Sequence, residues 1–234
     1  MKFVIGASMS RSMILAVMCA GCEWGGGPGL TGRQLPDAAP KPDAARAPSA
    51  DAAVDAQGSG SNAGPCMQPM ASGVLARWAF AGQPGNQVST AAASSAPGAT
   101  AGAVGRSADV VAATGADSMN ANGWPMVATL DTTKGYYTLA ITPPTGCTVS
   151  LTQASITTRE SGTGPSTLVA ATSDDNFTQT TALTASSTDA TSTPTLSVTD
   201  AAASVEVRVF GYGASSADGT FRLDGSLTLT GSFQ

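Results

Sequence analysis

The sequence contains no histidine, and only 5% of its 234 residues are aromatic and 12% are charged. Without histidine the chain has no Ser-His-Asp triad, no imidazole proton shuttle and no histidine ligand for a metal. Its 11 Lys and Arg residues are outnumbered by 16 Asp and Glu residues, which gives a net charge of −5. This charge has the wrong sign for binding phosphate backbones, so we expect no nucleic acid among the partners.

Residues 1–22 have the pattern of a lipoprotein signal peptide. A basic start precedes an apolar core at 13–18, which is much shorter than the roughly 20 apolar residues that cross a bilayer. The segment ends in the letters CAGC at 19–22, which resemble a bacterial lipobox with Cys where Leu is usual. The resemblance implies cleavage before Cys22 and a lipid anchor on its sulfur. The alternative is a conventional signal peptide followed by an ordinary thiol.

Residues 23–65 have the composition of a spacer, with ten Ala, eight Gly and six Pro. Because such a segment has little apolar surface to bury, we expect a disordered linker. It resembles the Pro-Asp-Ala spacers behind the lipid cysteine in bacterial surface lipoproteins, especially myxobacterial ones. Glu23, rather than Asp, follows Cys22, which by resemblance to bacterial sorting rules suggests the outer membrane or cell surface.

Residues 66–234 alternate apolar and polar side chains with the period of two that is typical of β-strands. In 205–210 the three valines face one way and Glu206, Arg208 and Phe210 the other, and in 74–80 the even-numbered residues form one set. Turn sequences separate the strands, and no helical stripe of eleven or more residues is present. The pattern predicts one all-β domain, a β-sandwich of jelly-roll type.

Cys66 and Cys147 are the only cysteines in this domain. In an extracytoplasmic compartment a disulfide between them is favoured over two buried thiols. It would close a loop of about 80 residues, which is worth roughly 4–5 kcal/mol on the loop-entropy estimate.

Six short segments of the domain resemble an uncharacterised domain of secreted and surface-sorted bacterial proteins, including proteins with PEP-CTERM-type sorting tails. The segments are RWAF at 77–80, NGW at 122–124, YYTL at 136–139, RESGTGP at 159–165, SDDNF at 173–177 and VRVFGYG at 207–213. The resemblance implies a β-sandwich outside the cytoplasm and carries no known activity or catalytic residue.

Paired carboxylates are the one common catalytic arrangement that the composition still allows, because Asp and Glu alone can hydrolyse glycosides. Most acids of the domain lie in turns, where they usually bond to the backbone. Glu160 beside Arg159, and Glu206 near Arg208, are placed for simple ion pairs. A glycan-active enzyme is therefore kept as an alternative, with no catalytic residues assigned.

Asp174, Asp175 and Asn176 place three oxygen-bearing side chains in one loop, and Ca²⁺ prefers six to eight oxygen ligands. A calcium site here needs further ligands from the backbone or distant loops. The alternative is a turn stabilised by its own side chains, with no ion and no cofactor.

The outward face of strand 205–210 is a candidate ligand surface. Arg208, Phe210 and Tyr212, joined by Trp124, have the aromatic and charged character on which sugar rings dock. The alternative is that a second layer or a long loop covers these side chains.

These patterns together predict a non-catalytic, lipid-anchored protein of the cell envelope, a surface interaction or adhesion module. Its partner would be the membrane through the lipid, together with a polysaccharide or another envelope protein. A glycan-active enzyme and a purely structural envelope component remain the alternatives.

Overall fold

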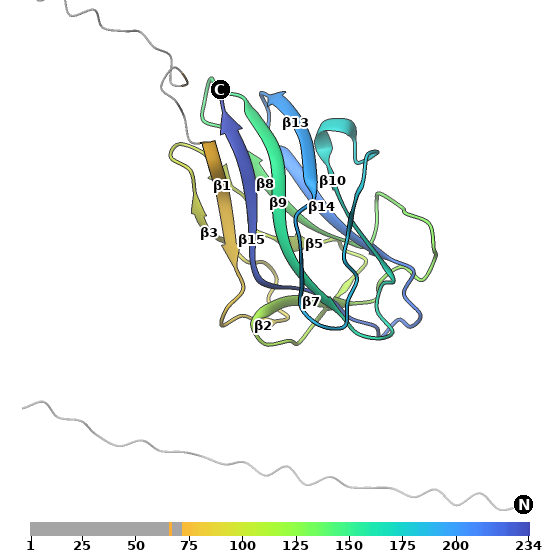
Figure 1. Cartoon of the computed structure of the whole chain (residues 1–234). Helices are drawn as coiled ribbons and strands as arrows, with labels where there is room; N and C mark the ends of the chain where they lie inside the picture. The colour runs from red at the N-terminus through yellow and green to blue at the C-terminus, as the bar shows by residue number, and fades with distance from the viewer. Residues whose placement is uncertain (1–65, 67–71) are drawn as a thin grey trace, which may run out of the picture. The chain divides into compact units, whose positions relative to one another are not determined.

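The computed structural model describes Cys66 and residues 72–234 (Figure 1). The predicted signal peptide, the lipid cysteine Cys22 and the linker 23–65 lie outside the described residues. The described residues form two β-sheets packed as a sandwich, which confirms the all-β prediction. None of their helices is long and apolar enough to cross a membrane.

The larger sheet has nine strands. They are β1 (Ser72–Ala79), β2 (Pro84–Gly85), β3 (Ala92–Ser95), β6 (Val111–Ala113), β7 (Ser118–Asn122), β9 (Val149–Glu160), β12 (Ala190–Ser192), β13 (Thr195–Ala201) and β15 (Phe221–Phe233). The order along the sheet is β12-β9-β15-β1-β3, with β13 also pairing β9 and β7 also pairing β15. Strands β2 and β6 pair with β7, and the β2–β7 pair is the parallel one. In Figure 1 strands β1, β15 and β9 lie in front of β8 and β14.

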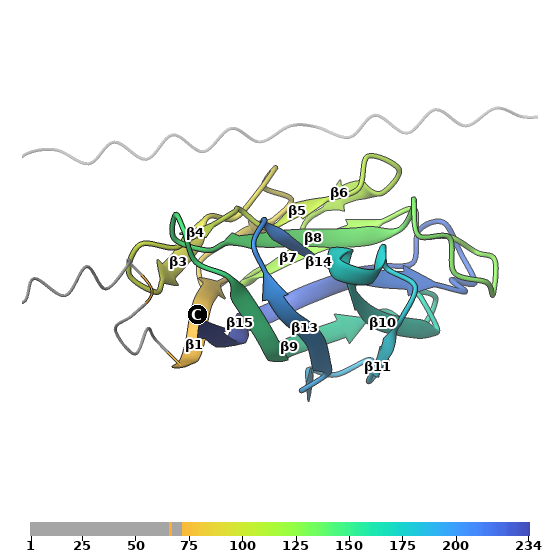
Figure 2. The ribbon, with the colours of Figure 1, turned by 90° about the horizontal axis from the view of Figure 1, so that it is seen from above.

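The second sheet has six strands. They are β4 (Thr100–Ala101), β5 (Gly105–Arg106), β8 (Tyr136–Thr142), β10 (Thr167–Thr172), β11 (Thr181–Leu183) and β14 (Val205–Tyr212). The order is β11-β10-β14-β8-β4, with β5 also pairing β8. A short 3₁₀ turn, η1 (Ser173–Asp175), follows β10 directly. Both Figure 1 and Figure 2 show β13 of the larger sheet beside β10 and η1.

The core between the sheets follows the alternation read from the sequence. Val205, Val207 and Val209 of β14 are buried in it, as predicted. The first strand departs from the alternation, because a β-bulge lies between Val74 and Ala76. The bulge turns Leu75 into the core and leaves Val74 56% exposed, so Val74 does not share the face of Trp78 as the simple period predicted.

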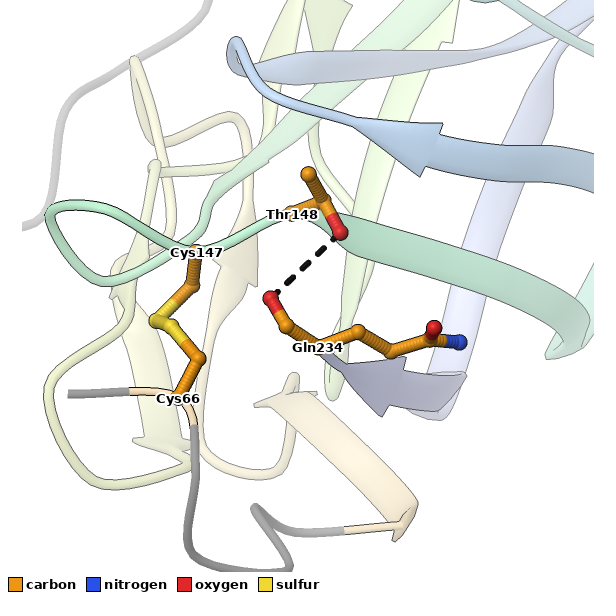
Figure 3. The surroundings of a disulfide bond; sticks show 4 residues. All are labelled: Cys66, Cys147, Thr148 and Gln234. Carbon is orange, nitrogen blue, oxygen red and sulfur yellow. Dashed lines mark hydrogen bonds between the residues drawn. A yellow bond between two sulfur atoms is a disulfide. The ribbon is translucent and has the colours of Figure 1, made fainter. Parts of the chain in front are cut away.

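A disulfide joins Cys66 to Cys147, as predicted, with the two Cα atoms 5.6 Å apart (Figure 3). Cys147 immediately precedes Thr148, whose backbone N–H donates to the carbonyl oxygen of Gln234 and whose carbonyl accepts from the Gln234 N–H. The disulfide therefore ties Cys66 to the chain segment that also holds Gln234.

Candidate functional site

The outward face of β14 is organised around Arg208. Its Nε donates to Glu206 at 2.8 Å, and one terminal nitrogen donates to the carbonyl oxygen of Thr132 at 2.8 Å. The guanidinium carbon lies 4.1 Å from the ring centroid of Tyr136 and 4.0 Å from that of Phe177. The predicted Glu206–Arg208 ion pair is thus present, inside a cation–π sandwich.

Phe210, two residues further on, is fully buried on this same face. It forms a small apolar cluster with Val169 and Ala171, and Leu130, Tyr136, Phe177 and Tyr212 pack against that cluster. Residues from two loops therefore cover the face, which is the alternative named for it above.

Trp124 does not belong to this face at all. Its side chain is 2% exposed and lies in the main core against Tyr137 and Phe221, with ring centroids 5.3 and 4.9 Å away. The expected exposed surface of Trp124, Arg208, Phe210 and Tyr212 is therefore not formed. Arg208 and Tyr212 are half-buried, Phe210 is covered by the loops, and Trp124 is buried in the main core.

The loop of Asp174, Asp175 and Asn176 forms η1 and its C-terminal cap. The two carboxylate oxygens of Asp175 accept backbone hydrogen bonds from Thr178 at 3.2 Å and Gln179 at 2.8 Å. Asp175 thus stabilises its own turn. Among the described residues no group of three or more His, Cys, Asp or Glu side chains is placed to hold a metal ion.

A pocket opens beside this turn, where the edges of the two sheets meet. We call it the seam pocket; it is lined by residues 170–172, 174–175, 179–181 and 195–197 and has a volume of about 150 Å³. Its inner wall comes from the buried Ala170, Ala171 and Leu196. A hydrogen bond of 3.1 Å from the Thr181 hydroxyl to the Thr195 carbonyl joins β11 to β13 at its side.

The rim of the seam pocket is rich in hydroxyl groups. It is formed by exposed or half-exposed side chains that carry hydroxyl, amide or carboxylate groups: Asp174, Asp175, Gln179, Thr180, Thr181, Thr195 and Ser197. No lysine or arginine lines the pocket. A polar rim of hydroxyls, an amide and carboxylate acceptors, without a cation, suits a ligand that carries many hydroxyl groups.

A second hollow lies where β9 ends and β15 begins. We call it the charged cleft; it has a volume of about 310 Å³, and its lining is Thr114, Asn120, Arg159, Glu160, Ser161, Thr220 and Arg222. Asn120 is 4% exposed; its amide nitrogen donates to the Thr114 carbonyl at 2.7 Å. Burial raises the pKa of Glu160 above its ordinary value.

An ion-pair network runs beside the charged cleft. Arg222 pairs with Asp224 at 3.0 Å, and Arg159 reaches both Asp224 at 3.9 Å and Asp189 at 3.5 Å. Arg159 therefore pairs with these two aspartates and not with Glu160, its neighbour in the sequence. Burial, followed by the nearby charge of Asp189, raises the pKa of Asp224 to about 6.

Asp189 and Asp224 both lie against the Arg159 guanidinium, and the charge of Asp189 contributes to the raised pKa of Asp224. The two carboxyl groups therefore belong to one ion-pair network. Neither lines the charged cleft, so they are not placed to act on a sugar bound there.

The sequence pointed to neither hollow. The Thr- and Ser-rich stretches that line the seam pocket resemble ordinary strand and turn residues, and they lie on strands of different sheets. The one local signal was the acidic turn at 174–176, which the pocket adjoins.

The fold and the seam pocket define this chain as a β-sandwich protein with a polar pocket. Comparisons with known proteins add little to that description. No protein-family model and no curated protein matches the sequence. Among solved structures, the N-terminal cellulose-binding domain of β-1,4-glucanase C from Cellulomonas fimi is similar, with 13% identity and a TM-score of 0.27. The match covers 58% of this chain and 88% of that one. A TM-score this low supports no conclusion about a ligand of this chain.

Proposed function

We propose that this chain is a non-catalytic, lipid-anchored protein of the cell envelope whose β-sandwich, of jelly-roll type, binds polysaccharide at the seam pocket. In this proposal the lipid is on Cys22 at the outer membrane or cell surface, and residues 23–65 are the spacer between membrane and domain. The Cys66–Cys147 disulfide supports an extracytoplasmic location, because disulfides persist in oxidising compartments.

The observation that carries the proposal is the chemistry of the seam pocket. The residues at its base, Ala170, Ala171 and Leu196, are at most 4% exposed, so the accessible lining is mainly polar. The rim offers hydroxyls and the Gln179 amide, which both donate and accept, as sugar hydroxyls do. A volume of about 150 Å³ suits a single small unit of a longer chain that continues into solvent.

The two carboxylates of the seam pocket favour binding over catalysis. Both oxygens of Asp175 are taken by backbone N–H donors, so this group is not free to exchange protons with a substrate. Only Asp174 is then left at the rim, and glycoside hydrolysis requires two working carboxyl groups.

The test is binding of the purified full chain to a panel of bacterial and plant polysaccharides, followed by isothermal titration calorimetry. Ser197 is exposed and lines the pocket, so Ser197→Trp should fill it and abolish binding. The matched control is Ser94→Trp, an exposed serine on β3 outside the pocket lining, which should bind normally. Binding that survives Ser197→Trp would move the site elsewhere. If no polysaccharide of the panel binds, polysaccharide is rejected as the partner, and an envelope protein or a structural role is favoured.

A glycan-active enzyme is the second candidate, and the raised pKa of Glu160 in the charged cleft is the observation that favours it. A carboxyl group whose pKa is raised by burial is better suited than an ordinary one to act as a general acid. Release of reducing ends from a panel polysaccharide, lost on Glu160→Gln and kept on Ser197→Trp, would establish this alternative against the first.

A further inference from the structure

The seam pocket contains acceptors and negative charge but no cation. Asp174 and Asp175 contribute two carboxylates to the lining, while the other nine lining residues are uncharged. Neither of these aspartates takes part in an ion pair among the described residues. The potential inside the pocket is therefore negative, and the net charge of −5 on the whole chain has the same sign.

The cation on the adjacent strand does not offset this charge. Arg208 lies opposite Ala171 in the β10–β14 pair. Its guanidinium is held by Glu206 at 2.8 Å and is enclosed between the rings of Tyr136 and Phe177. Its charge is thus already paired, and its fork of donors is directed to Glu206 and Thr132.

The two carboxylates differ in what they can do. Asp175 is fixed by the N–H groups of Thr178 and Gln179, whose dipoles offset part of its charge. Asp174 is exposed at the rim, within the same pocket. An incoming ligand would meet the charge of Asp174 first.

From this arrangement we infer that the seam pocket accepts an uncharged sugar unit and rejects acidic sugars, and that Asp174 is the residue that sets this selectivity. The inference rests on the proposed polysaccharide function and names the chemical class of its ligand. A uronate carboxylate entering the pocket loses water and meets two like charges, without a guanidinium or ammonium to pair with. A neutral hexose brings hydroxyl donors, which carboxylate, hydroxyl and amide oxygens accept.

The test uses the neutral polysaccharide that the full chain binds most tightly, together with the same polysaccharide oxidised at C6 to the uronate. We expect the oxidised form to bind at least about tenfold more weakly at low salt, and the gap to narrow at high salt because the repulsion is screened. Oxidation also removes the C6 hydroxyl, so a variant must separate charge from hydrogen bonding.

Asp174→Asn makes that separation, because it removes the charge and keeps the shape. In the variant the affinity for the uronate form, divided by the affinity for the neutral form, should rise several-fold above the wild-type ratio. Asp218→Asn, an exposed turn aspartate outside the pocket lining, is the matched control and should keep the full gap.

Three results would overturn the inference: an acidic polysaccharide as the tightest ligand of the panel, equal binding of the neutral and oxidised forms, or a gap unchanged by Asp174→Asn. In each of these cases the proposed function survives if Ser197→Trp still abolishes binding. If no polysaccharide binds at all, the proposed function fails, and the inference fails with it.

Discussion

The phenol of Tyr137 donates a 2.6 Å hydrogen bond to the backbone carbonyl oxygen of Phe221, 84 residues later in the chain. Tyr137 belongs to β8 of the six-stranded sheet and Phe221 to β15 of the nine-stranded sheet, so the bond joins the two layers. Both side chains are fully buried, with ring centroids 5.3 Å apart. Burial raises the pKa of Tyr137 well above its ordinary value, which keeps the phenol a neutral donor.

Removing this hydroxyl should destabilise the fold without disturbing the aromatic packing. We expect Tyr137→Phe to lower the free energy of unfolding by about 1–2 kcal/mol, because the buried carbonyl loses a partner. Urea denaturation followed by fluorescence measures the change. The matched control is Tyr136→Phe, a half-buried neighbour on the outer face, which should cost less. Equal costs for the two variants would mean that the bond between the layers contributes nothing specific.

Because of the disulfide, we expect the oxidised protein to be much more stable to heat than the reduced protein. It closes a loop across 81 residues of sequence, for which the loop-entropy estimate is about 4–5 kcal/mol. We expect a reducing agent to lower the midpoint of thermal unfolding markedly, and the double variant Cys66→Ala and Cys147→Ala to show the same low midpoint with or without reductant. A double variant as stable as the oxidised wild type would contradict this estimate.

Asp224 predicts a loss of stability between about pH 4 and pH 6. Its pKa in the folded state is raised from the ordinary 3.8 to about 6, so the folded state holds this proton more tightly than the unfolded state. Stability is therefore highest below pH 4 as far as this group is concerned, and it falls as pH rises through 6. A difference of about two pKa units corresponds to about 3 kcal/mol.

Asp224→Asn keeps a neutral side chain at every pH and should remove this decrease. The measurement is the free energy of unfolding from pH 4 to 7 for the wild type, for Asp224→Asn and for the exposed control Asp218→Asn. Of the two variants, only Asp218→Asn should still lose stability as the pH rises. If Asp224→Asn follows the wild-type curve, another group causes the slope.

The strand pattern could be predicted from the sequence because it depends on local alternation. Val205, Val207 and Val209 are buried because alternate residues of a strand point to the same face of the sheet. The bulge at Leu75 could not be predicted, since an extra residue in one strand is visible only against its partner strand β15.

The covering of Phe210 likewise lies outside what a local pattern shows. The face of β14 alternates as expected, yet Leu130 and Phe177 close over it from loops far apart in the chain. The seam pocket depends on the meeting of β10, β11 and β13, which belong to two sheets. A sequence indicates which residues are polar, but it does not indicate which sheet edges come together.

The lipid anchor is a prediction that lies wholly outside the described residues, and Cys22 decides it. Cys22→Ala removes the sulfur that would carry the lipid, so the protein should leave the membrane fraction or be missorted. Mass spectrometry of the mature N-terminus gives the direct measurement. The control is Cys19→Ala, which should keep the lipid on Cys22. An unmodified N-terminus together with unchanged membrane partitioning would rule out the anchor.

Arg208 shows why charge alone does not explain the covered face of β14. Its guanidinium lies between the rings of Tyr136 and Phe177, and its N–H groups donate to Glu206 and to the Thr132 carbonyl. Lysine keeps the positive charge but has neither the planar surface nor the fork of donors. We therefore expect Arg208→Lys to destabilise the domain by about 1–2 kcal/mol, since a partly buried carboxylate and a carbonyl lose partners. The loop that carries Thr132 should then exchange its amide hydrogens faster than in the wild type, which hydrogen exchange measures. Wild-type stability and exchange in Arg208→Lys would show that the charge, and not the shape of the guanidinium, holds this face.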